Sequence, residues 1–383
     1  MKKICIVTTI SGTLRSFALE TAKYLYNECG YDVTLICNTD MAFAESLPTY
    51  IHYIPVKMAR GIDFSAISSI NELCKIFKRE KFDMVQYATP NASLYASIAA
   101  RLTKVPVRLY SQWGIRYVGF SGGMSRRIFK MLEKIVCRNS THVRAVSRMN
   151  MQFAVDEGLY KAEKAKVVGN GGTIGVDMSE YDVSKKQQWR DEIRDKYGID
   201  ENAFVLGFVG RVSADKGCVE LLSAFRNVCD KHENLRLMLI GSSEYSGEKI
   251  EELMKWAESS DKVIVAGRVD KPFMKNYYSA LDVLVHPTYR EGFGMVIQEA
   301  GALSVPVITT RIPGASEVMV DNESCILVEP RSITELEEAL VSLAENPDRV
   351  KQLGDAAYER TKTLYDRPIM LENQKNDYVD LLG

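Results

Sequence analysis

Residues 287–300 read PTYREGFGMVIQEA and decide how the chain is interpreted. The apolar run 280–286 before them predicts a strand, and the apolar-periodic end of the segment predicts a short helix. A glycine-rich loop that opens a helix presents backbone N–H groups without partners, and such groups favour an anion. Glu291 and Glu299 flank the start of that helix. Because carboxylates accept hydrogen bonds from hydroxyl groups, the segment predicts a ligand with both phosphates and hydroxyls, such as a nucleotide sugar.

The same residues resemble the E-x7-E motif of retaining glycosyltransferases of family 4, which have the two-domain GT-B fold. The resemblance implies that Glu299 holds the ribose hydroxyls and that Glu291 holds hydroxyls of the transferred sugar. It also implies that the amides of Phe293, Gly294 and Met295 face the leaving diphosphate. The alternative is one glutamate that caps a helix and another that faces water.

A second motif lies in the sequence GRVSADKG at 210–217, after the apolar run 203–210. Two cations on a loop between a strand and a helix can neutralise a diphosphate, which predicts that role for Arg211 and Lys216. The G-R-x4-K-G spacing also resembles the diphosphate-binding motif of family 4. The resemblance implies that Arg211, Lys216 and Glu291 are the catalytic residues. It adds Gly210 to the donor site and implies that the backbone at Arg268 and Val269 contacts the base.

Length and pattern predict an α/β protein of two domains. A chain of 383 residues is too long for one ordinary core, and strand–helix units repeat along it. We expect two Rossmann-like parallel sheets that face each other across a cleft, as in GT-B enzymes. The expected acceptor domain spans 1–180 and the expected nucleotide-sugar domain spans 195–365, with the tail at about 366–383 packing back on the first domain.

The first predicted strand leads into Ile10-Ser11-Gly12-Thr13-Leu14, which we expect to be a turn before a helix that begins near Ser16. By resemblance, the backbone at Gly12 contacts the donor; the alternative is a plain turn glycine. The G-x-G-x-x-G pattern of dinucleotide-binding proteins is absent, which argues against a dehydrogenase.

Positive charge is concentrated in the first half of the chain. Residues 1–180 hold 24 Lys and Arg against 15 Asp and Glu, and the stretch 101–150 holds eleven basic residues and one acid, Glu133. Such a block favours an anionic partner, and no nucleic acid is expected.

Residues 117–138 are the part of this block that we expect to contact such a partner. We predict a helix over 122–138 that, together with Tyr117 and Phe120, rests on an anionic membrane or binds the pyrophosphate of a lipid-linked acceptor. The alternative is an ordinary helix whose apolar stripe packs on a core. The expected apolar stripe, with the basic residues on the other side, is Met124, Ile128, Met131, Leu132 and Ile135.

Several classes of site are not expected. Eight scattered Cys without a C-x-x-C pair and only four His argue against zinc and disulfides and favour a reduced cytoplasm. The absence of Asp-x-Asp implies, by resemblance, a metal-free enzyme without a cofactor. No apolar run is long enough to span a membrane, so we expect a cytoplasmic protein that is at most peripheral on the inner face of the plasma membrane.

The stretch 88–120 resembles the family members that build capsular and other surface polysaccharides, although Trp113 stands where many relatives have His. The expected function is therefore retaining transfer of a sugar, from a UDP-linked donor, to a glycan on a lipid pyrophosphate. No general base is identified. Three alternatives stay open: a GT-B epimerase, for which only His286 lies near a motif; a transferase with a soluble acceptor; and a non-catalytic nucleotide-sugar sensor.

Overall fold

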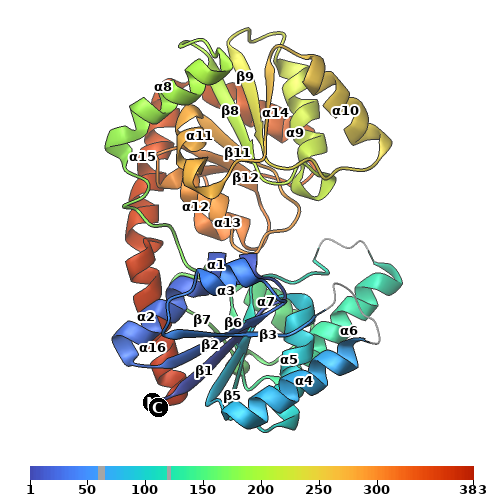
Figure 1. Cartoon of the computed structure of the whole chain (residues 1–383). Helices are drawn as coiled ribbons and strands as arrows, with labels where there is room; N and C mark the ends of the chain where they lie inside the picture. Colours follow the sequence, from blue (N-terminus) through green and yellow to red (C-terminus); the bar gives the residue numbers. More distant parts are fainter. Residues whose placement is uncertain (59–64, 119–121) are drawn as a thin grey trace. The chain divides into compact units, whose positions relative to one another are not determined.

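The computed structural model describes residues 1–58, 65–118 and 122–383. The chain divides into two compact units (Figure 1). Unit 1 contains Met1–Ile174 and Pro368–Gly383, and unit 2 contains Gly175–Arg367. Each unit is described separately below.

Within the described residues, unit 1 is built on a seven-stranded parallel sheet of order β3-β2-β1-β4-β5-β6-β7. Side chains alternate across β1, so Cys5 and Val7 join one apolar cluster while Ile4 and Ile6 join another. Both faces are therefore buried, which explains why the strands read as continuous apolar runs. The strands are β1 (Lys3–Val7), β2 (Asp32–Cys37), β3 (Ile51–Pro55), β4 (Met84–Tyr87), β5 (Val107–Gln112), β6 (His142–Ala145) and β7 (Ala165–Val167).

Helices cover both faces of this sheet (Figure 1). One face carries α1 (Ser11–Phe17), α2 (Leu19–Cys29), α3 (Met41–Glu45) and α16 (Arg367–Leu382). The other face carries α4 (Ser65–Glu80), α5 (Pro90–Leu102), α6 (Gly123–Asn139) and α7 (Arg148–Asp156). A short 3-10 helix, η1 (Ala162–Lys164), precedes β7.

Among the residues that the structure describes, unit 2 holds a six-stranded parallel sheet of order β10-β9-β8-β11-β12-β13. An apolar cluster fills the space between the sheet and helices α9, α10 and α14. The other side carries α8, α11, α12 and α15 (Figure 1). The strands are β8 (Phe204–Val209), β9 (Leu235–Ile240), β10 (Val263–Gly267), β11 (Val283–His286), β12 (Val307–Thr310) and β13 (Cys325–Val328). The helices are α8 (Lys186–Tyr197), α9 (Cys218–Val228), α10 (Glu248–Ser259), α11 (Met274–Ala280), α12 (Met295–Gly301), α13 (Ala315–Val318), α14 (Ile333–Ala344) and α15 (Pro347–Leu364), with 3-10 turns η2 (Val183–Lys185), η3 (Ala214–Lys216) and η4 (Lys271–Phe273).

The expected α/β class with two Rossmann-like parallel sheets is confirmed. The C-terminal residues from Pro368 onward belong to unit 1. They are held there by a buried ion pair between Arg144 and Asp377 (2.5 Å) and by a hydrogen bond from the Tyr378 hydroxyl to Gln86. Helix α8, which lies in the stretch expected to link the domains, packs on α11 inside unit 2.

The expected turn at Ile10–Leu14 is wrong. Helix α1 already begins at Ser11, so Gly12 lies in its first turn and is not among the residues with positive φ. Nothing lies within 4 Å of the position that a Cβ on Gly12 would take. The glycine therefore has no conformational or packing requirement in unit 1, and its contact with the donor stays a prediction.

Helix α6 forms as expected, but its orientation differs from the pattern read in the sequence. Met124, Ile128 and Met131 are 70%, 40% and 56% exposed, so this part of the expected stripe faces outward, whereas Leu132 and Ile135 are half-buried. The buried side of α6 carries Val136 and Cys137 instead. Basic residues share the exposed side with the apolar stripe. These exposed basic residues are Arg127, Lys134 and Arg138.

The other residues expected at a membrane are Tyr117, Phe120 and the remaining basic residues of α6. Tyr117 is 1% exposed and packs in the core near Phe153, so it cannot rest on a bilayer. Phe120 lies outside the described residues. Arg126 and Lys130 both form ion pairs with Glu157, at 2.9 and 2.8 Å, so they do not belong to the exposed basic face. No helix in the described parts of the chain is both long enough and apolar enough to cross a membrane.

Candidate donor site

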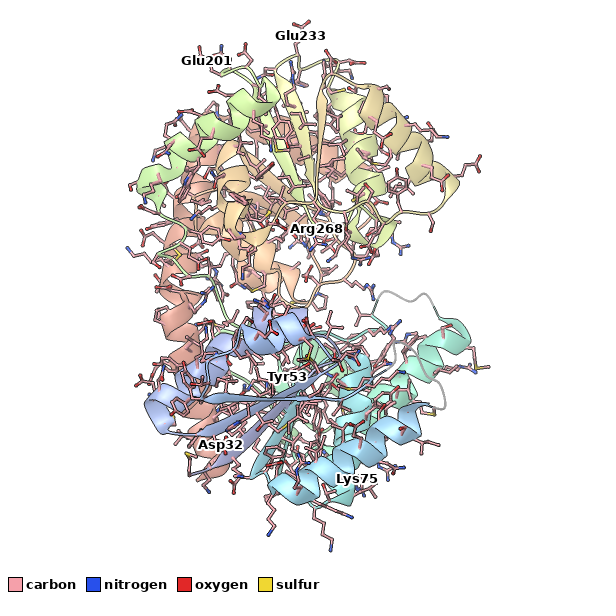
Figure 2. All side chains as sticks on the ribbon, in the orientation of Figure 1. Asp32, Tyr53, Lys75, Glu201, Glu233 and Arg268 are labelled. Atoms are coloured by element: carbon pink, nitrogen blue, oxygen red, sulfur yellow. The ribbon has the colours of Figure 1, made fainter. Side chains whose placement is uncertain are left out.

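The motif residues of unit 2 lie at the carboxyl ends of its strands. Arg211 follows β8, Arg268 follows β10, and Glu291 follows β11. Figure 2 shows Arg268 at this edge of the sheet, whereas Glu201 and Glu233 lie at the opposite edge. Because parallel strands end at the same edge, residues from separate βα loops can converge there on one ligand.

Lys216 and Glu291 meet at the centre of this edge. The Lys216 Nζ lies 2.8 Å from Glu291 Oε2, and both side chains are about four-fifths buried. The contact depends on Gly217, which has φ +74° and whose added Cβ would lie 1.9 Å from the Pro287 carbonyl oxygen. Only a glycine permits this close approach of the loop after β8 to the loop after β11. The two motifs, separate in the sequence, therefore form one site.

His286, the last residue of β11, completes the cluster. Its Nε2 lies 3.1 Å from the same Glu291 Oε2, and its ring is buried. Burial alone would raise the pKa of Glu291, but the hydrogen bond with His286 and the charge of Lys216 hold that pKa well below its usual range. Glu291 is therefore a carboxylate throughout the physiological pH range.

Arg211 also has acidic partners in this structure. Its guanidinium lies 3.3 Å from Asp215 and 3.2 Å from Glu244. Arg290 pairs with the same Asp215 at 3.1 Å. Burial raises the pKa of Asp215, but a hydrogen bond from Ser213 and the bond from Arg290 outweigh it and lower that pKa. The two expected diphosphate cations are therefore each balanced by carboxylates, which an anionic ligand would have to displace.

Glu299 lies in α12 and is held by tyrosines. The Tyr278 hydroxyl, on α11, donates to Glu299 Oε2 at 2.8 Å. Tyr181 also interacts with this carboxylate. Burial raises the pKa of Glu299, and the Tyr278 hydrogen bond opposes that rise. One carboxylate oxygen is thus fixed by the protein.

The predicted amide-bearing residues differ in what their side chains do. Phe293 is buried and packs edge to face on Tyr365, with 5.6 Å between the ring centroids, so its side chain belongs to the core. Gly294 has φ +69° and caps the seven-residue α12, which begins at Met295. A Cβ on Gly294 would lie 2.7 Å from Ile297. These residues shape the loop, and a role for their amides stays a prediction.

The remaining expected donor residues lie at loop positions. Gly210 directly follows β8 and has φ +146°. Its carbonyl oxygen lies so close to Gly241 that a Cβ on Gly241 would come within 1.8 Å of it. Arg268 is exposed and Val269 half-buried, both just after β10. Gly12 lies in unit 1 and is not brought together with these residues within unit 2.

Sequence reasoning missed the partners of the two glutamates. His286 stands next to a motif but carries no spacing that marks a role. Tyr278 lies 21 residues before Glu299, and only the packing of α11 beside α12 brings them together. No group of three or more His, Cys, Asp or Glu suited to a metal ion occurs in 1–58, 65–118 or 122–383.

One family model matches each of the two units. Residues 3–147 match the family model "Glycosyl transferase 4-like", and residues 189–360 match "Glycosyl transferases group 1". A capsular polysaccharide biosynthesis glycosyltransferase, CapM, from Staphylococcus aureus is 30% identical over 329 residues, which are 85% of this chain and 84% of CapM. The UDP-Gal:alpha-D-GlcNAc-diphosphoundecaprenol alpha-1,3-galactosyltransferase of Escherichia coli is 23% identical over 348 residues, which are 89% of this chain and 87% of that protein.

Solved structures show the same architecture. Anabaena HepE, determined in complex with UDP and glucose, superposes with a TM-score of 0.79 at 19% identity, covering 99% of this chain and 100% of HepE. At this identity the likeness establishes the fold alone, which is the expected GT-B fold.

Proposed function

Because the chain belongs to the family 4 glycosyltransferases, we propose that it is a retaining enzyme that transfers a sugar from a UDP-sugar to a glycan on a lipid pyrophosphate in surface polysaccharide synthesis. The observation that carries the donor part of this proposal is the buried cluster of Lys216, Glu291 and His286 at the carboxyl edge of unit 2. A lysine, a fixed carboxylate and a second carboxylate held by Tyr278 suit a ligand with a diphosphate at one end and hydroxyls on both sides.

Donor binding exchanges ion-pair partners. The diphosphate takes the places of Glu291 and of Asp215 as partner of Lys216 and Arg211, respectively. Glu291 keeps its hydrogen bond with His286 and becomes available to hydroxyls of the transferred sugar. Glu299, fixed by Tyr278, accepts from the ribose hydroxyls. Asp215 keeps Arg290 as its partner, and Glu291 keeps hydrogen bonds in place of its ion pair, so neither carboxylate is left without a polar partner.

The proposed reaction depends on stabilising the negative charge of the leaving diphosphate more than on a protein group that transfers a proton. The bond between the anomeric carbon and the diphosphate oxygen breaks, and the acceptor oxygen forms a bond to the same face of that carbon. The acceptor proton passes to the leaving diphosphate, so no protein base is needed. Negative charge grows on the diphosphate during this step, and Lys216 and Arg211 stabilise it where it develops. The proposed reaction needs no metal ion or cofactor.

The names of three similar proteins support the choice of donor and acceptor. The E. coli relative is named for transfer from UDP-Gal to a sugar on diphosphoundecaprenol, and HepE is described with bound UDP and glucose. CapM is named for capsular polysaccharide biosynthesis. These names motivate UDP as the nucleotide and a lipid diphosphate as the acceptor carrier.

The outward side of α6 supports a peripheral membrane location. Three exposed apolar side chains run along it, and three exposed basic residues flank them without an ion-pair partner among the described residues. Apolar residues that insert at the headgroup boundary, beside cations that attract anionic lipids, are typical of helices that lie on a membrane. The proposed surface is the cytoplasmic leaflet.

The proposal is tested by measuring UDP release from a panel of UDP-sugars, with EDTA present, in the absence and presence of sugar-diphosphate lipids. We expect one UDP-sugar and one acceptor to give turnover that EDTA does not reduce, and a product whose anomeric proton coupling matches that of the donor. An inverted anomer, or turnover that depends on added metal, would contradict the mechanism. A 2-epimerised donor without transfer would favour the epimerase alternative.

A further inference from the structure

Unit 1 contains a cavity whose lining residues are not among those of the candidate donor site in unit 2. Its volume is about 420 Å³, and it lies where β1 and β4 end. These two strands are neighbours in the sheet, and the chain runs outward from them in opposite directions, through β2 and β3 on one side and β5 to β7 on the other. Such a switch point is where open parallel sheets bind ligands, and the volume suits a small molecule.

Threonine, asparagine and arginine side chains line this cavity beside the apolar Ile10 and Pro90, and none of the described lining residues is acidic. Thr9 follows β1, Thr89 follows β4, and Thr13 and Asn91 come from the helices that begin next to them. The Thr9 and Thr89 hydroxyls lie 2.8 Å apart, and the Thr9 amide donates to Thr89 Oγ1 at 3.1 Å. Thr89 keeps φ +68° and ψ 144°, a conformation that is strained for a β-branched residue. The Thr9 and Thr89 side chains are therefore held in fixed places beside the cavity.

Among the described residues that line the cavity, Arg116 supplies the only charge. Its guanidinium stacks on the Phe129 ring of α6, with 4.4 Å between the guanidinium carbon and the ring centroid. The stacking fixes an otherwise flexible side chain, and it connects the cavity to the helix whose outer side carries the apolar and basic surface. A planar guanidinium beside hydroxyl donors matches the geometry of a phosphoryl group.

We propose that this cavity binds a phosphoryl or pyrophosphoryl group of the acceptor, with Arg116 as the charged ligand and Thr9, Thr13 and Thr89 as hydrogen-bonding partners. The inference rests on the proposed function for the identity of the molecule that carries the phosphate. The cavity next to α6 then receives the diphosphate of a lipid-linked glycan whose lipid stays in the membrane.

The test uses inorganic pyrophosphate and isothermal titration calorimetry on the full chain carrying Arg211→Ala and Lys216→Ala, which weaken the donor site. We expect pyrophosphate to bind this variant and acetate not to bind. Adding Arg116→Gln should weaken pyrophosphate binding by about tenfold or more, because a charge-assisted contact is lost. The matched control, Arg127→Gln, removes an exposed arginine of α6 and should change the affinity less than about twofold.

Two further measurements distinguish binding of acceptor phosphate from binding of lipid headgroups and from loss of folding. Arg116→Gln should leave binding to vesicles of 30% phosphatidylglycerol unchanged, since the cavity is expected to bind acceptor phosphate and not lipid headgroups. A Thr13→Val variant, nearly equal in shape, should weaken pyrophosphate binding and thereby keep the test valid if Arg116→Gln lowers the melting temperature. Absence of pyrophosphate binding, or equal losses in Arg116→Gln and Arg127→Gln, would overturn the site. UDP titration of the unmodified chain reports on the proposed function separately.

Discussion

Lys216 and Glu291 are the residues on which the proposed donor site depends, and they are paired with each other in the structure. Replacing Lys216 by Met keeps the length of the side chain and removes its charge. We expect kcat to fall by about 10² to 10³, the usual consequence of losing one group that stabilises a developing anion. Steady-state kinetics with the active UDP-sugar measure this loss. A change confined to KM would mean that Lys216 only binds the donor.

The loss of stability in the Lys216→Met variant should depend on pH. Glu291 has a folded-state pKa below its unfolded value, so its contribution to stability is present above the unfolded pKa and is lost as pH falls through the folded pKa. Lys216→Met raises the folded pKa of Glu291 toward its usual value. The melting temperature of the variant should therefore fall below that of the parent at pH 7, and the difference should shrink as the pH falls below the unfolded pKa.

Two substitutions of His286 distinguish a role in hydrogen bonding from a role in packing. His286→Leu removes the partner that holds Glu291 when Lys216 turns to the diphosphate, and we expect kcat/KM to fall about tenfold. His286→Gln carries an amide N–H that can replace the Nε2 contact and should recover most of the activity. If Gln and Leu are equally impaired, His286 acts through packing and not through Glu291.

Tyr278 positions the second glutamate. Tyr278→Phe removes the hydroxyl that donates to Glu299 Oε2 and should raise KM for the UDP-sugar several-fold with little change in kcat. The pKa of Glu299, already raised by burial, rises further without this bond, so the loss should be larger at lower pH. Tyr277→Phe is the matched control, since that hydroxyl bonds Lys196 and Tyr197 instead. An equal effect of the two variants would contradict the assignment.

At the residue scale the sequence identifies groups whose spacing is local. Arg211 and Lys216 share one loop, and Glu291 and Glu299 bracket one helix start, so short motifs suffice. The partners Tyr278 and His286 could not be assigned in this way, because their roles follow from side-chain directions and from packing between neighbouring elements. The pairing of Lys216 with Glu291 likewise depends on two loops meeting at Gly217.

At the scale of elements, helix α6 shows what periodicity can and cannot predict. A period of 3.6 residues correctly predicts a helix with an apolar stripe, but it does not say whether that stripe meets a core or a bilayer. In unit 1 the core takes Val136 and Cys137, and the stripe from Met124 to Met131 faces outward. The prediction around Gly12 was wrong in a different way: the sequence pattern predicts a turn there, but helix α1 already begins at Ser11.

The proposed membrane contact of α6 gives a prediction at this scale. Ile128→Glu places a charge in the middle of the exposed stripe and should weaken binding to vesicles of 30% phosphatidylglycerol by about tenfold or more. Co-sedimentation measures the bound fraction. Ile67→Glu, on the exposed side of α4, is the control and should bind as the parent does. Equal binding of the parent and of Ile128→Glu would remove α6 from the membrane contact.

At the scale of the whole molecule, the two parallel sheets follow from the sequence, because strands buried on both faces read as apolar runs and alternate with helices. The packing of the C-terminal helix on unit 1 was expected only from the family resemblance. The interactions that hold it include a charge pair and a network of polar contacts beside the apolar packing of Tyr378 and Leu382, and the polar contacts leave no periodic pattern in the sequence.

Attachment of α16 to unit 1 can be measured through its buried ion pair. Asp377→Asn leaves Arg144 buried without its carboxylate and should lower the free energy of unfolding by about 3 to 5 kcal/mol. Asp380→Asn, an exposed residue 3.5 Å from Lys166, should change it by less than about 1 kcal/mol. Urea unfolding followed by circular dichroism compares the two variants. Similar midpoints for both would mean that the pair does not anchor α16.

The central claim is that unit 2 binds a nucleoside diphosphate sugar through Lys216 and Arg211 without metal. The most direct measurement is the shift in melting temperature of the purified protein with UDP, GDP, ADP and their sugars, each with and without EDTA. We predict a shift with UDP and a UDP-sugar that is unaffected by EDTA and is lost in Arg211→Ala and Lys216→Ala. No shift with any nucleotide, or an undiminished shift in both variants, would contradict the account.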